Sequence, residues 1–415
     1  MATARRTDVV VVGAGHSGLS MSKQLADRAV DHVVLERAEV ASSWRRQRWD
    51  SFTLLTPNWQ TRLPGAAYDG DDPDGFMTGA EVAGFIAEYA TTIDAPVECG
   101  TAVSRVRRDG DDYWLATSNG TWRCRAVVVA GGACSLPSTP DFTAGVPPGI
   151  VQVSPLEYRA PDQLPDRGVL VVGAAATGVQ MAEEIHASGR PVTLSVGEHV
   201  RMPRTYRGYD IQHWMEATGR LDERYDEVED VGKARKVASP QLIGTPERRT
   251  VDLNRLAEMG VQLRGRLGAI RDGVALFSGG LRNHCTLADQ KLGRLLDDID
   301  EWIVAHGISG VGEPERYEPT HVPKGSPLTL DLTNGEIGAL VWATGFRPDL
   351  SWVDASLLDR AGRLRHDGGV CDPPGLYLLG TTFLRRRRSS FIHGASADSA
   401  DLADHLVDHL DGRLR

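Results

Sequence analysis

The residues whose spacing most directly suggests chemistry are three glycines near the start of the chain. They form the pattern Gly13-x-Gly15-x-x-Gly18, which follows an apolar stretch at residues 9–12 and precedes a segment compatible with a helix. Gly13 permits a tight turn, Gly15 lets the backbone approach a diphosphate, and Gly18 lets the helix lie close to the sheet. The helix N-terminus would present free N–H groups to that anion. The pattern predicts a dinucleotide site, and a glycine-rich turn without a ligand is the alternative.

Glu36 indicates which dinucleotide this first site would take. It follows a second apolar strand at residues 32–35, at about the 20-residue spacing that such an acid usually has from the glycines. A carboxylate there accepts hydrogen bonds from a ribose 2′-hydroxyl, and its charge repels a 2′-phosphate. FAD or NAD therefore fits this site better than NADP.

The same order of strand, turn and helix recurs from Gly168. Its turn reads Gly173-x-Ala175-x-x-Gly178, so a methyl group stands where the backbone would approach phosphate. We expect a second dinucleotide site here, with looser or slightly displaced binding because of Ala175.

The second strand of this repeat ends at Ser195 rather than at an acid. Arg201, Arg204 and Arg207 follow shortly after it. Loss of the acid and gain of guanidinium groups suit a 2′-phosphate, so the second site is predicted to bind NADP(H), with Ser195, Arg201 and Arg204 among its contacts. In the alternative interpretation these arginines only solvate a surface loop.

A segment rich in aromatic residues lies at residues 42–65 and contains Trp44, Trp49 and Trp59. Such flat side chains could line a pocket for a ring-shaped cofactor or substrate, and Trp44 is counted among the expected cofactor contacts. Packing in the hydrophobic core is the alternative.

The elements that must position these residues indicate an α/β fold with two Rossmann-like dinucleotide-binding domains and a small antiparallel meander. Residues 137–166 are rich in proline and are a candidate linker. Further elements are expected as follows: helices at about 78–91, 206–219 and 286–305 and from about 396, the meander at 96–122 with turns at Asp109-Gly110 and Asn119-Gly120, and apolar strands at 126–130 and 338–342.

Composition excludes several classes of protein. The chain has 415 residues and a formal net charge of −10, which argues against general nucleic-acid binding because phosphates need basic surface. No apolar run reaches about 18 residues, so no membrane span is expected. The first residues lead into a strand without a secretory apolar region, which predicts a cytoplasmic protein.

The cysteines and histidines predict no metal site and no disulfide chemistry. The five cysteines are never spaced CxxC and are interpreted as small core residues. The histidines form neither HxxxH nor HExxH. His16 could touch FAD or simply be exposed beside the helix start, and it is assigned no catalytic role. The basic run Arg385–Arg388 is interpreted as a solvated loop, with an anion site as the alternative.

Together, the two nucleotide turns, the tryptophan-rich segment and the sequence ATGFRPD at residues 343–349 resemble the class B flavoprotein monooxygenases. The resemblance is closer to bacterial single-chain proteins related to flavin-containing and Baeyer–Villiger monooxygenases, and it covers essentially the full length. It implies FAD at the first turn and Glu36, and NADPH at the second turn and the arginines after Ser195. It also implies a discontinuous FAD domain at 1–155 and 326–415, with the NADPH domain inserted at 160–325.

The resemblance also implies two further site residues. Asn58, in Thr56-Pro57-Asn58, matches an asparagine that lies near the reactive flavin edge, and it is the expected catalytic residue; a turn residue after proline is the alternative. Asp398 matches an acid close to the flavin, or it is a plain helix cap. The sequence departs from the family fingerprint between the domains, where Ser154 stands in place of a histidine four residues before the aromatic Tyr158.

The function implied is oxygen transfer to a small organic substrate. NADPH would reduce FAD, and O₂ would form a flavin C4a-(hydro)peroxide that transfers one oxygen atom to nitrogen, sulfur or a carbonyl carbon. An NADPH-dependent reductase or oxidase that releases H₂O₂ is the alternative, and a non-enzymatic flavin redox sensor is a further one. The expected partners are a small organic substrate and O₂. Binding to nucleic acid or to a membrane is not expected, and the sequence leaves open whether the protein forms a homodimer.

Overall fold

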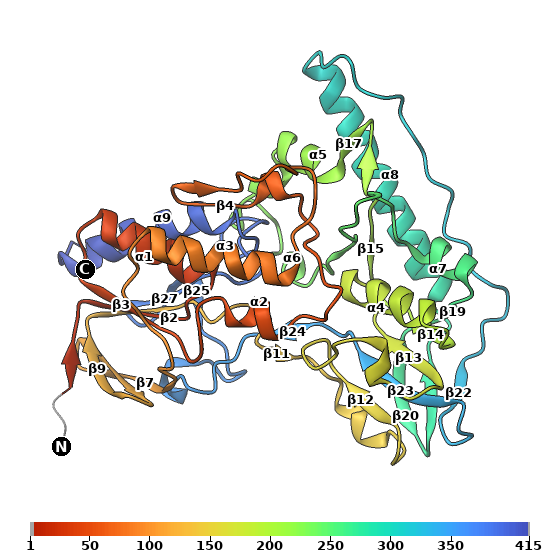
Figure 1. Ribbon diagram of the computed structural model, residues 1–415, viewed down its shortest axis with the longest axis horizontal. Coiled ribbons are helices and arrows are strands. Elements are labelled where there is room, and N and C mark those ends of the chain that lie inside the picture. The colour runs from red at the N-terminus through yellow and green to blue at the C-terminus, as the bar shows by residue number, and fades with distance from the viewer. Residues whose placement is uncertain (1–3, 414–415) are drawn as a thin grey trace.

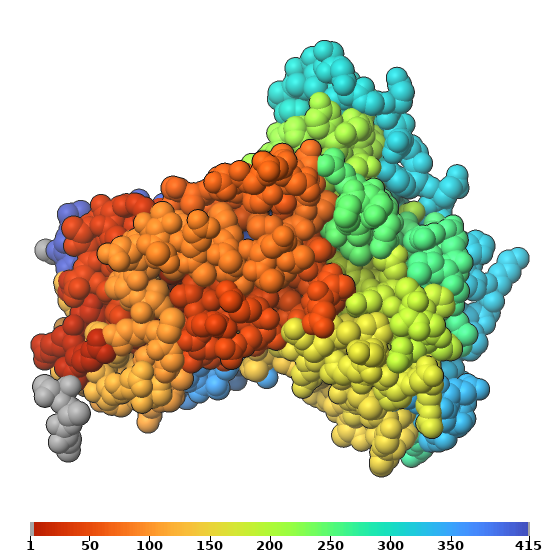
Figure 2. All heavy atoms as spheres, viewed as in Figure 1, coloured from red at the N-terminus to blue at the C-terminus, as the bar shows by residue number. Residues whose placement is uncertain are grey.

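The computed structural model describes residues 4–413, which form two α/β units placed side by side (Figure 1). Figure 2 shows the N-terminal residues of the first unit, in red and orange, meeting the yellow and green residues of the second unit. Within residues 4–413, no helix has the length and apolar character needed to cross a membrane.

The first unit is built on a seven-stranded sheet with the order β25-β26-β27-β10-β2-β3-β6. The five strands from β27 to β6 run parallel, whereas β25 and β26 form an antiparallel edge. The bounds are β2 (Val9–Val12), β3 (His32–Leu35), β6 (Val97–Glu98), β10 (Ala126–Val129), β25 (His366–Asp367), β26 (Val370–Cys371) and β27 (Leu376–Leu378).

The central strands are apolar at every position because both faces of the sheet are covered. Helices α1 (His16–Asp27), α3 (Gly79–Thr92) and α9 (Ala395–Leu410) lie on one side in Figure 1. A meander lies on the other side, with the strand order β1-β9-β8-β7. Its strands are β1 (Arg5–Arg6), β7 (Val103–Asp109), β8 (Asp112–Thr117) and β9 (Gly120–Cys124), which confirms the expected meander and its two turns.

The start of α3 follows from its sequence. The Thr78 hydroxyl accepts a hydrogen bond from the Glu81 backbone N–H at 3.3 Å, and the Glu81 carboxylate accepts one from the Thr78 backbone N–H at 2.7 Å. This reciprocal capping satisfies two N–H groups that have no partner within the helix.

The second unit is built on a five-stranded parallel sheet with the order β12-β23-β13-β14-β19. Alternate residues of β13 face opposite sides. Val169 and Val171 pack with α4 and α7, whereas Leu170 and Val172 pack with a second, three-stranded sheet. The bounds are β12 (Val151–Val153), β13 (Gly168–Val172), α4 (Ala176–Ala187), β14 (Val192–Ser195), α7 (Leu253–Met259), β19 (Gln262–Arg264), β20 (Leu267–Arg271), β21 (Val274–Phe277), β22 (Thr329–Asp331) and β23 (Ile337–Trp342).

The long helix α8 (Leu281–Ala305) runs along the outer side of the second unit (Figure 1). The helix predicted over 206–219 is shorter than expected: α5 begins at Ile211, because residues before it form a hairpin whose turn holds Arg207 and Gly208 at positive φ. The remaining elements are α2 (Ser42–Arg46), α6 (Val231–Ala234), β4 (Arg62–Leu63), β5 (Ala66–Ala67), β11 (Leu136–Pro137), β15 (Val200–Arg201), β16 (Thr205–Tyr206), β17 (Tyr209–Asp210), β18 (Pro240–Gln241), β24 (Phe346–Arg347), α5 (Ile211–Ala217), and 3₁₀ turns at Asn58–Gln60, Asp141–Gly145, Pro161–Gln163, Arg220–Asp222 and Ala355–Leu357.

The chain passes between the units where β11 pairs antiparallel with β24. This placement differs from the expected boundaries at 155 and 326, because β12, β22 and β23 all belong to sheets of the second unit. A fully apolar strand such as β23 can enter the interior of either parallel sheet, so its composition does not reveal which sheet it joins.

Candidate active site

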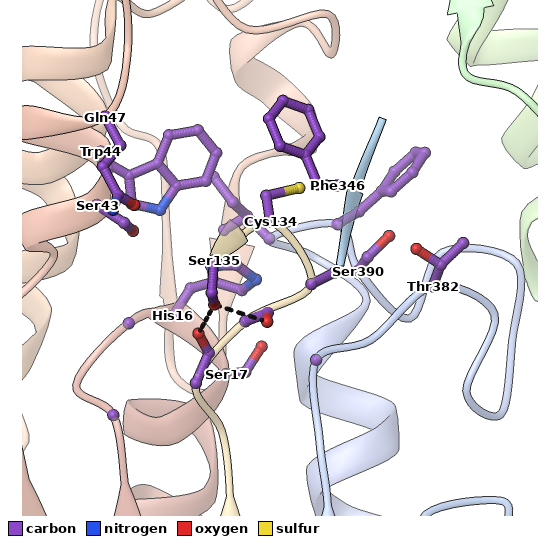
Figure 3. Close-up of a pocket in the computed structure, with 18 of the residues that line it drawn as sticks. His16, Ser17, Ser43, Trp44, Gln47, Cys134, Ser135, Phe346, Thr382 and Ser390 are labelled. Atoms are coloured by element: carbon purple, nitrogen blue, oxygen red, sulfur yellow. Dashed lines mark hydrogen bonds between the residues drawn. The ribbon is translucent and has the colours of Figure 1, made fainter. Parts of the chain in front are cut away.

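A cavity of about 910 Å³ lies where the two units meet. The first unit contributes the first glycine turn, the segment around α2, and the loops that follow β10, β24 and β27. The second unit contributes the start of α4 and residues near α5, α6 and β18. Figure 3 shows Trp44 and Gln47 near the α2 segment, with Cys134 on the loop after β10 and Phe346 at the start of β24.

The first glycine turn has the geometry of a phosphate cradle. Gly13 has a φ of +109°, and a Cβ on Gly18 would collide with the carbonyl oxygen of Gly13. A Cβ on Gly15 would meet no protein atom within 4 Å, so the space above this turn is open. The Ser17 hydroxyl and His16 Nε2 are buried there without a hydrogen-bond partner (Figure 3). Open space and unpartnered polar atoms at a helix N-terminus fit a bound diphosphate.

His16 is neutral in this setting. Burial, together with the nearby charge of Arg48, lowers the pKa of His16 to about 4. An uncharged imidazole leaves Nε2 free to act as either donor or acceptor toward a ligand, depending on its tautomer.

Glu36 lines the cavity and is buried. Its carboxylate accepts hydrogen bonds from the backbone N–H of Ala14 at 2.9 Å and of Ala38 at 3.0 Å. These bonds fix the side chain at the end of β3, and a carboxylate has further lone pairs for ribose hydroxyls. The structure therefore brings Gly13, Gly15 and Glu36 to one wall of the cavity, as the sequence predicted.

The second glycine turn repeats this geometry. Gly173 has a φ of +110°, and a Cβ on Gly178 would collide with the carbonyl oxygen of Gly173. Ala175 has φ −77° and ψ −177°, close to the −84° and −178° of Gly15. The backbone at this position is extended, so alanine adopts it without strain. Only the start of α4, at Ala176 and Thr177, reaches the cavity lining.

The strand register corrects the comparison between Glu36 and Ser195. Val12 pairs with Leu35 in the first sheet, and Val172 pairs with Ser195 in the second. Ser195 is therefore the counterpart of Leu35, and the counterpart of Glu36 is the buried Val196. The acid is still missing from the second unit. However, the Ser195 hydroxyl is already used, since it donates to the Gly265 carbonyl at 3.2 Å and accepts from the Leu267 N–H at 2.8 Å.

The expected phosphate contacts Arg201 and Arg204 are instead buried in ion pairs. Arg201 is bonded to Asp252 and to Asp289, each at 2.8 Å. Arg204 is fully buried, paired with Asp210, and donates to the Leu55 carbonyl at 2.8 Å. These guanidinium groups are already neutralised by carboxylates, Arg201 by two distant ones and Arg204 by Asp210 six residues later, so neither is a free cation in this structure. Arg207 is likewise paired, with Asp300.

Arg266 is an exposed cation that sequence reasoning missed. It follows β19, the strand beside β14, and its aliphatic carbons lie 3.6 Å from where a Cβ on Gly197 would be. Gly197 follows the end of β14, which is where a dinucleotide-binding unit recognises the adenosine ribose. The signal in the sequence was the Gly265-Arg266 pair directly after the short strand β19.

Asn58 does not line the cavity; its side chain fixes a loop. The amide Nδ2 donates to the Asp72 carbonyl at 2.9 Å, and Oδ1 accepts from the Met77 N–H at 2.8 Å. Both polar ends are thus occupied by backbone groups. The prediction of Asn58 as the catalytic residue is not supported, and Thr56 from the same segment lines the cavity in its place.

Asp398 is completely buried and bonded to Arg386 at 2.8 Å rather than facing the cavity. Burial raises the pKa of Asp398 above its ordinary value, while Arg386 acts in the opposite direction. The other arginines of the run are also paired, with Asp401, Glu223 and Asp222. The run Arg385–Arg388 is therefore a set of ion pairs that joins the first unit to residues 222–223, and the interpretation as a solvated loop was wrong.

Of the three tryptophans, Trp44 and Trp49 line the cavity, whereas Trp59 is not part of its lining. Trp49 meets Phe52 edge to face at a centroid distance of 5.0 Å. Cys134 also lines the cavity, which corrects its interpretation as a core residue, and burial raises the pKa of its thiol. Across residues 4–413 all five cysteines are free, and His, Cys, Asp and Glu side chains form no group that could hold a metal ion.

Two glycine turns, each followed by a helix whose start lines the same cavity, define a two-dinucleotide flavoprotein oxidoreductase fold; the first has an acid after its second strand and the second has none. Residues 10–243 match the pyridine nucleotide-disulphide oxidoreductase family, and the chain belongs to this family. This membership supports FAD and NADPH as the cofactors.

Individual proteins with similar sequences or structures agree with this class. An uncharacterized CzcO-like oxidoreductase of Geobacillus kaustophilus (strain HTA426) is 27% identical over 97% of the chain and 99% of that protein. The indole-3-pyruvate monooxygenase YUCCA1 of Oryza sativa subsp. japonica is 30% identical over 48% of the chain and 50% of that protein. The flavin-containing monooxygenase of Stenotrophomonas maltophilia has the same fold, with a TM-score of 0.64, 19% identity and coverage of 98% of this chain and 99% of that one. The predicted relationship to flavoprotein monooxygenases is confirmed.

Proposed function

We propose that this protein is an FAD- and NADPH-dependent monooxygenase that transfers one oxygen atom from O₂ to a small organic substrate. The observation that carries the proposal is the single cavity lined by both the first glycine turn and the start of α4. Two dinucleotides held at these helix N-termini would bring their reactive rings into one enclosed space.

The first unit would hold FAD through its turn and Glu36. The α1 N-terminus and the Ser17 hydroxyl would bind the diphosphate, and the Glu36 carboxylate would accept the ribose hydroxyls. FAD, when bound and reduced by NADPH, supplies the capacity to activate O₂. The residues of the chain bind and orient the cofactor and shape its surroundings.

Coenzyme preference would depend on Arg266. Arg201 and Arg204 are occupied by carboxylates, whereas Arg266 is exposed beside Gly197. Val196 stands where the first unit has its acid, so the carboxylate that would repel a 2′-phosphate at that position is missing, although the exposed Glu198 follows two residues later. The guanidinium of Arg266 would bind the 2′-phosphate.

The remaining cavity wall favours oxygen transfer over release of H₂O₂. It is formed largely by apolar side chains, including Phe52, Met202, Met215, Phe383 and Phe391. Such a wall excludes water, which would otherwise discharge the activated oxygen. Disulfide reduction, the other chemistry in the family's description, needs a pair of thiols. Cys134 lines the cavity as a free cysteine, and burial disfavours its thiolate.

The test is an absorption spectrum of the purified protein, followed by anaerobic titration with NADPH and then with NADH. We expect a flavin band that is bleached by NADPH at lower concentration than by NADH. Amines, sulfides and ketones are then supplied in air, and H₂O₂ is measured against NADPH consumed. One H₂O₂ per NADPH with every substrate would replace the monooxygenase proposal with the oxidase alternative, and an absent flavin band would remove both.

A further inference from the structure

Arg48 is a cation inside the cavity without a carboxylate partner. Three arginines contribute to the lining. Arg387 is paired with Glu223, and Arg37 is exposed to solvent. Arg48 is half-buried, and its guanidinium donates a hydrogen bond to the carbonyl of Gln47 at 2.8 Å. Over the described range 4–413, Arg48 takes part in no ion pair.

The surroundings of Arg48 are aromatic and neutral. The guanidinium carbon lies 4.8 Å from the ring centre of Trp44 and 5.4 Å from that of Phe52. The titratable neighbours are His16, which is neutral, and the Cys134 thiol. Burial lowers the pKa of Arg48, yet a guanidinium keeps its proton in proteins. A permanent charge is thus half-buried at the cavity wall, with no opposite charge paired to it among the described residues.

Such an arrangement is costly unless a ligand supplies the opposite charge. A buried charge without a partner is among the least favourable groups in a protein interior, and cation–π contacts with two rings offset only part of that cost. The enclosed arginines Arg201, Arg204 and Arg207 each have an aspartate partner, and the buried Arg264, which has none, bonds to the Pro327 carbonyl and to the amide oxygen of Gln262. Arg48, by contrast, faces the cavity, where a ligand can reach it.

The anion that fits best is a carboxylate. A guanidinium binds the two oxygens of a carboxylate side by side in one plane. The diphosphates of the two dinucleotides have their own binding groups, at the N-termini of α1 and α4. Arg48 packs against Trp44 and Phe52, and its charge also acts on His16 beside the first glycine turn. Flat rings beside the cation would receive the apolar part of the same ligand.

We propose that Arg48 binds the carboxylate of an organic-acid substrate whose flat, apolar part packs between Trp44 and Phe52. This inference rests on the proposed function, because it names the substrate class of that same cavity. A charged hydrogen-bonded pair in an enclosed site adds about 1.5–3 kcal/mol, which is roughly a 10- to 100-fold gain in affinity over an uncharged analogue of the same shape.

The test compares binding of phenylacetate with that of phenylacetamide, its uncharged analogue, by isothermal titration calorimetry on the oxidised protein. Arg48→Gln removes the charge, Arg48→Lys keeps it without the two-pronged geometry, and Arg45→Gln is the matched control because Arg45 is an exposed neighbour outside the lining. We expect wild type and Arg45→Gln to prefer phenylacetate by about tenfold or more. Arg48→Gln should lose this preference, and Arg48→Lys should retain part of it.

Three results would overturn the inference. The first is a wild-type protein that binds the amide as tightly as the acid, and the second is an Arg48→Gln variant with an unchanged preference. In the third, Arg48→Gln loses the preference but also binds FAD or NADP⁺ more weakly, which would assign the anion to a cofactor. If Arg48→Gln does not fold, loss of part of the preference in Arg48→Lys decides the question. The titration measures binding and needs no turnover. A protein that prefers phenylacetate but never oxygenates a substrate would therefore refute the proposed function and leave the inference on Arg48 standing.

Discussion

Replacing Arg204 with methionine tests whether the arginines after β14 stabilise the fold or bind the cofactor. In the structure Arg204 is fully buried, and its partner Asp210 has a side chain only 7% exposed. The variant would leave the Asp210 carboxylate and the Leu55 carbonyl without their cationic donor. Breaking a buried ion pair by removal of one partner costs about 3–5 kcal/mol, so we expect the free energy of unfolding to fall by that amount.

The assay is urea denaturation followed by circular dichroism, alongside the KM for NADPH and for NADH. The double variant Arg204→Met/Asp210→Asn is the control. It removes the unpaired charge and keeps an oxygen that can accept the Gln212 N–H, which Asp210 now does at 2.8 Å, so it should recover much of the lost stability. If Arg204→Met instead raises the KM for NADPH alone and leaves stability unchanged, Arg204 binds the 2′-phosphate and the reasoning fails.

Three further variants extend these tests. Arg266→Ala should raise the KM for NADPH by about 10- to 100-fold and leave that for NADH unchanged, since it removes one charged hydrogen-bonding group; equal effects on both coenzymes would contradict its role. Asn58→Ala should lower the free energy of unfolding by about 1–3 kcal/mol, because two hydrogen bonds to backbone are lost. It should leave kcat nearly unchanged, and a large loss of kcat in a stable variant would restore the catalytic assignment. His366 has a pKa lowered to about 4, chiefly by burial, and its Nδ1 accepts the Gly369 N–H at 3.2 Å. The unfolded state takes up a proton below about pH 6.5 and the folded state does not, so stability should fall between about pH 6.5 and pH 4 by at most about 1.4 kcal/mol per pH unit. His366→Gln should weaken that dependence in a pH series of urea denaturations, and an unchanged slope would argue against it.

Local patterns in the sequence were enough to predict the two nucleotide units. Gly18 and Gly178 stand where a Cβ would collide with the carbonyl oxygen of Gly13 or Gly173, so that requirement acts within one turn of chain. A Cβ on Gly13 or Gly173 would collide with the backbone of Ala130 or Ala343 on a distant segment, so the motif itself, and not this contact, identified those two glycines. The helix at α3 could be placed for the same reason, since Thr78 and Glu81 cap it locally.

Most partners of the arginines could not be predicted, because they come from distant parts of the chain; Asp210, six residues after Arg204, is the exception. Arg201 meets Asp252 and Asp289, and nothing near Arg201 indicates either carboxylate. A second error, in the comparison of the two strand ends, came from the register of the paired strands. The expectation compared Ser195 with Glu36, although the pairing of β13 with β14 makes Ser195 the match of Leu35. A shift of one residue moves a side chain to the opposite face of a sheet, and only the pairing itself resolves it.

The antiparallel pairing of β11 with β24 has a consequence for how this protein can be rearranged. Leu136 lies opposite Arg347, so the long segment between them leaves the first unit and returns to it at adjacent points. Segments with adjacent ends are the ones that proteins tolerate as insertions. The second unit could therefore be exchanged between relatives as a cassette, with both junctions placed in one two-stranded ribbon and the seven-stranded sheet left intact.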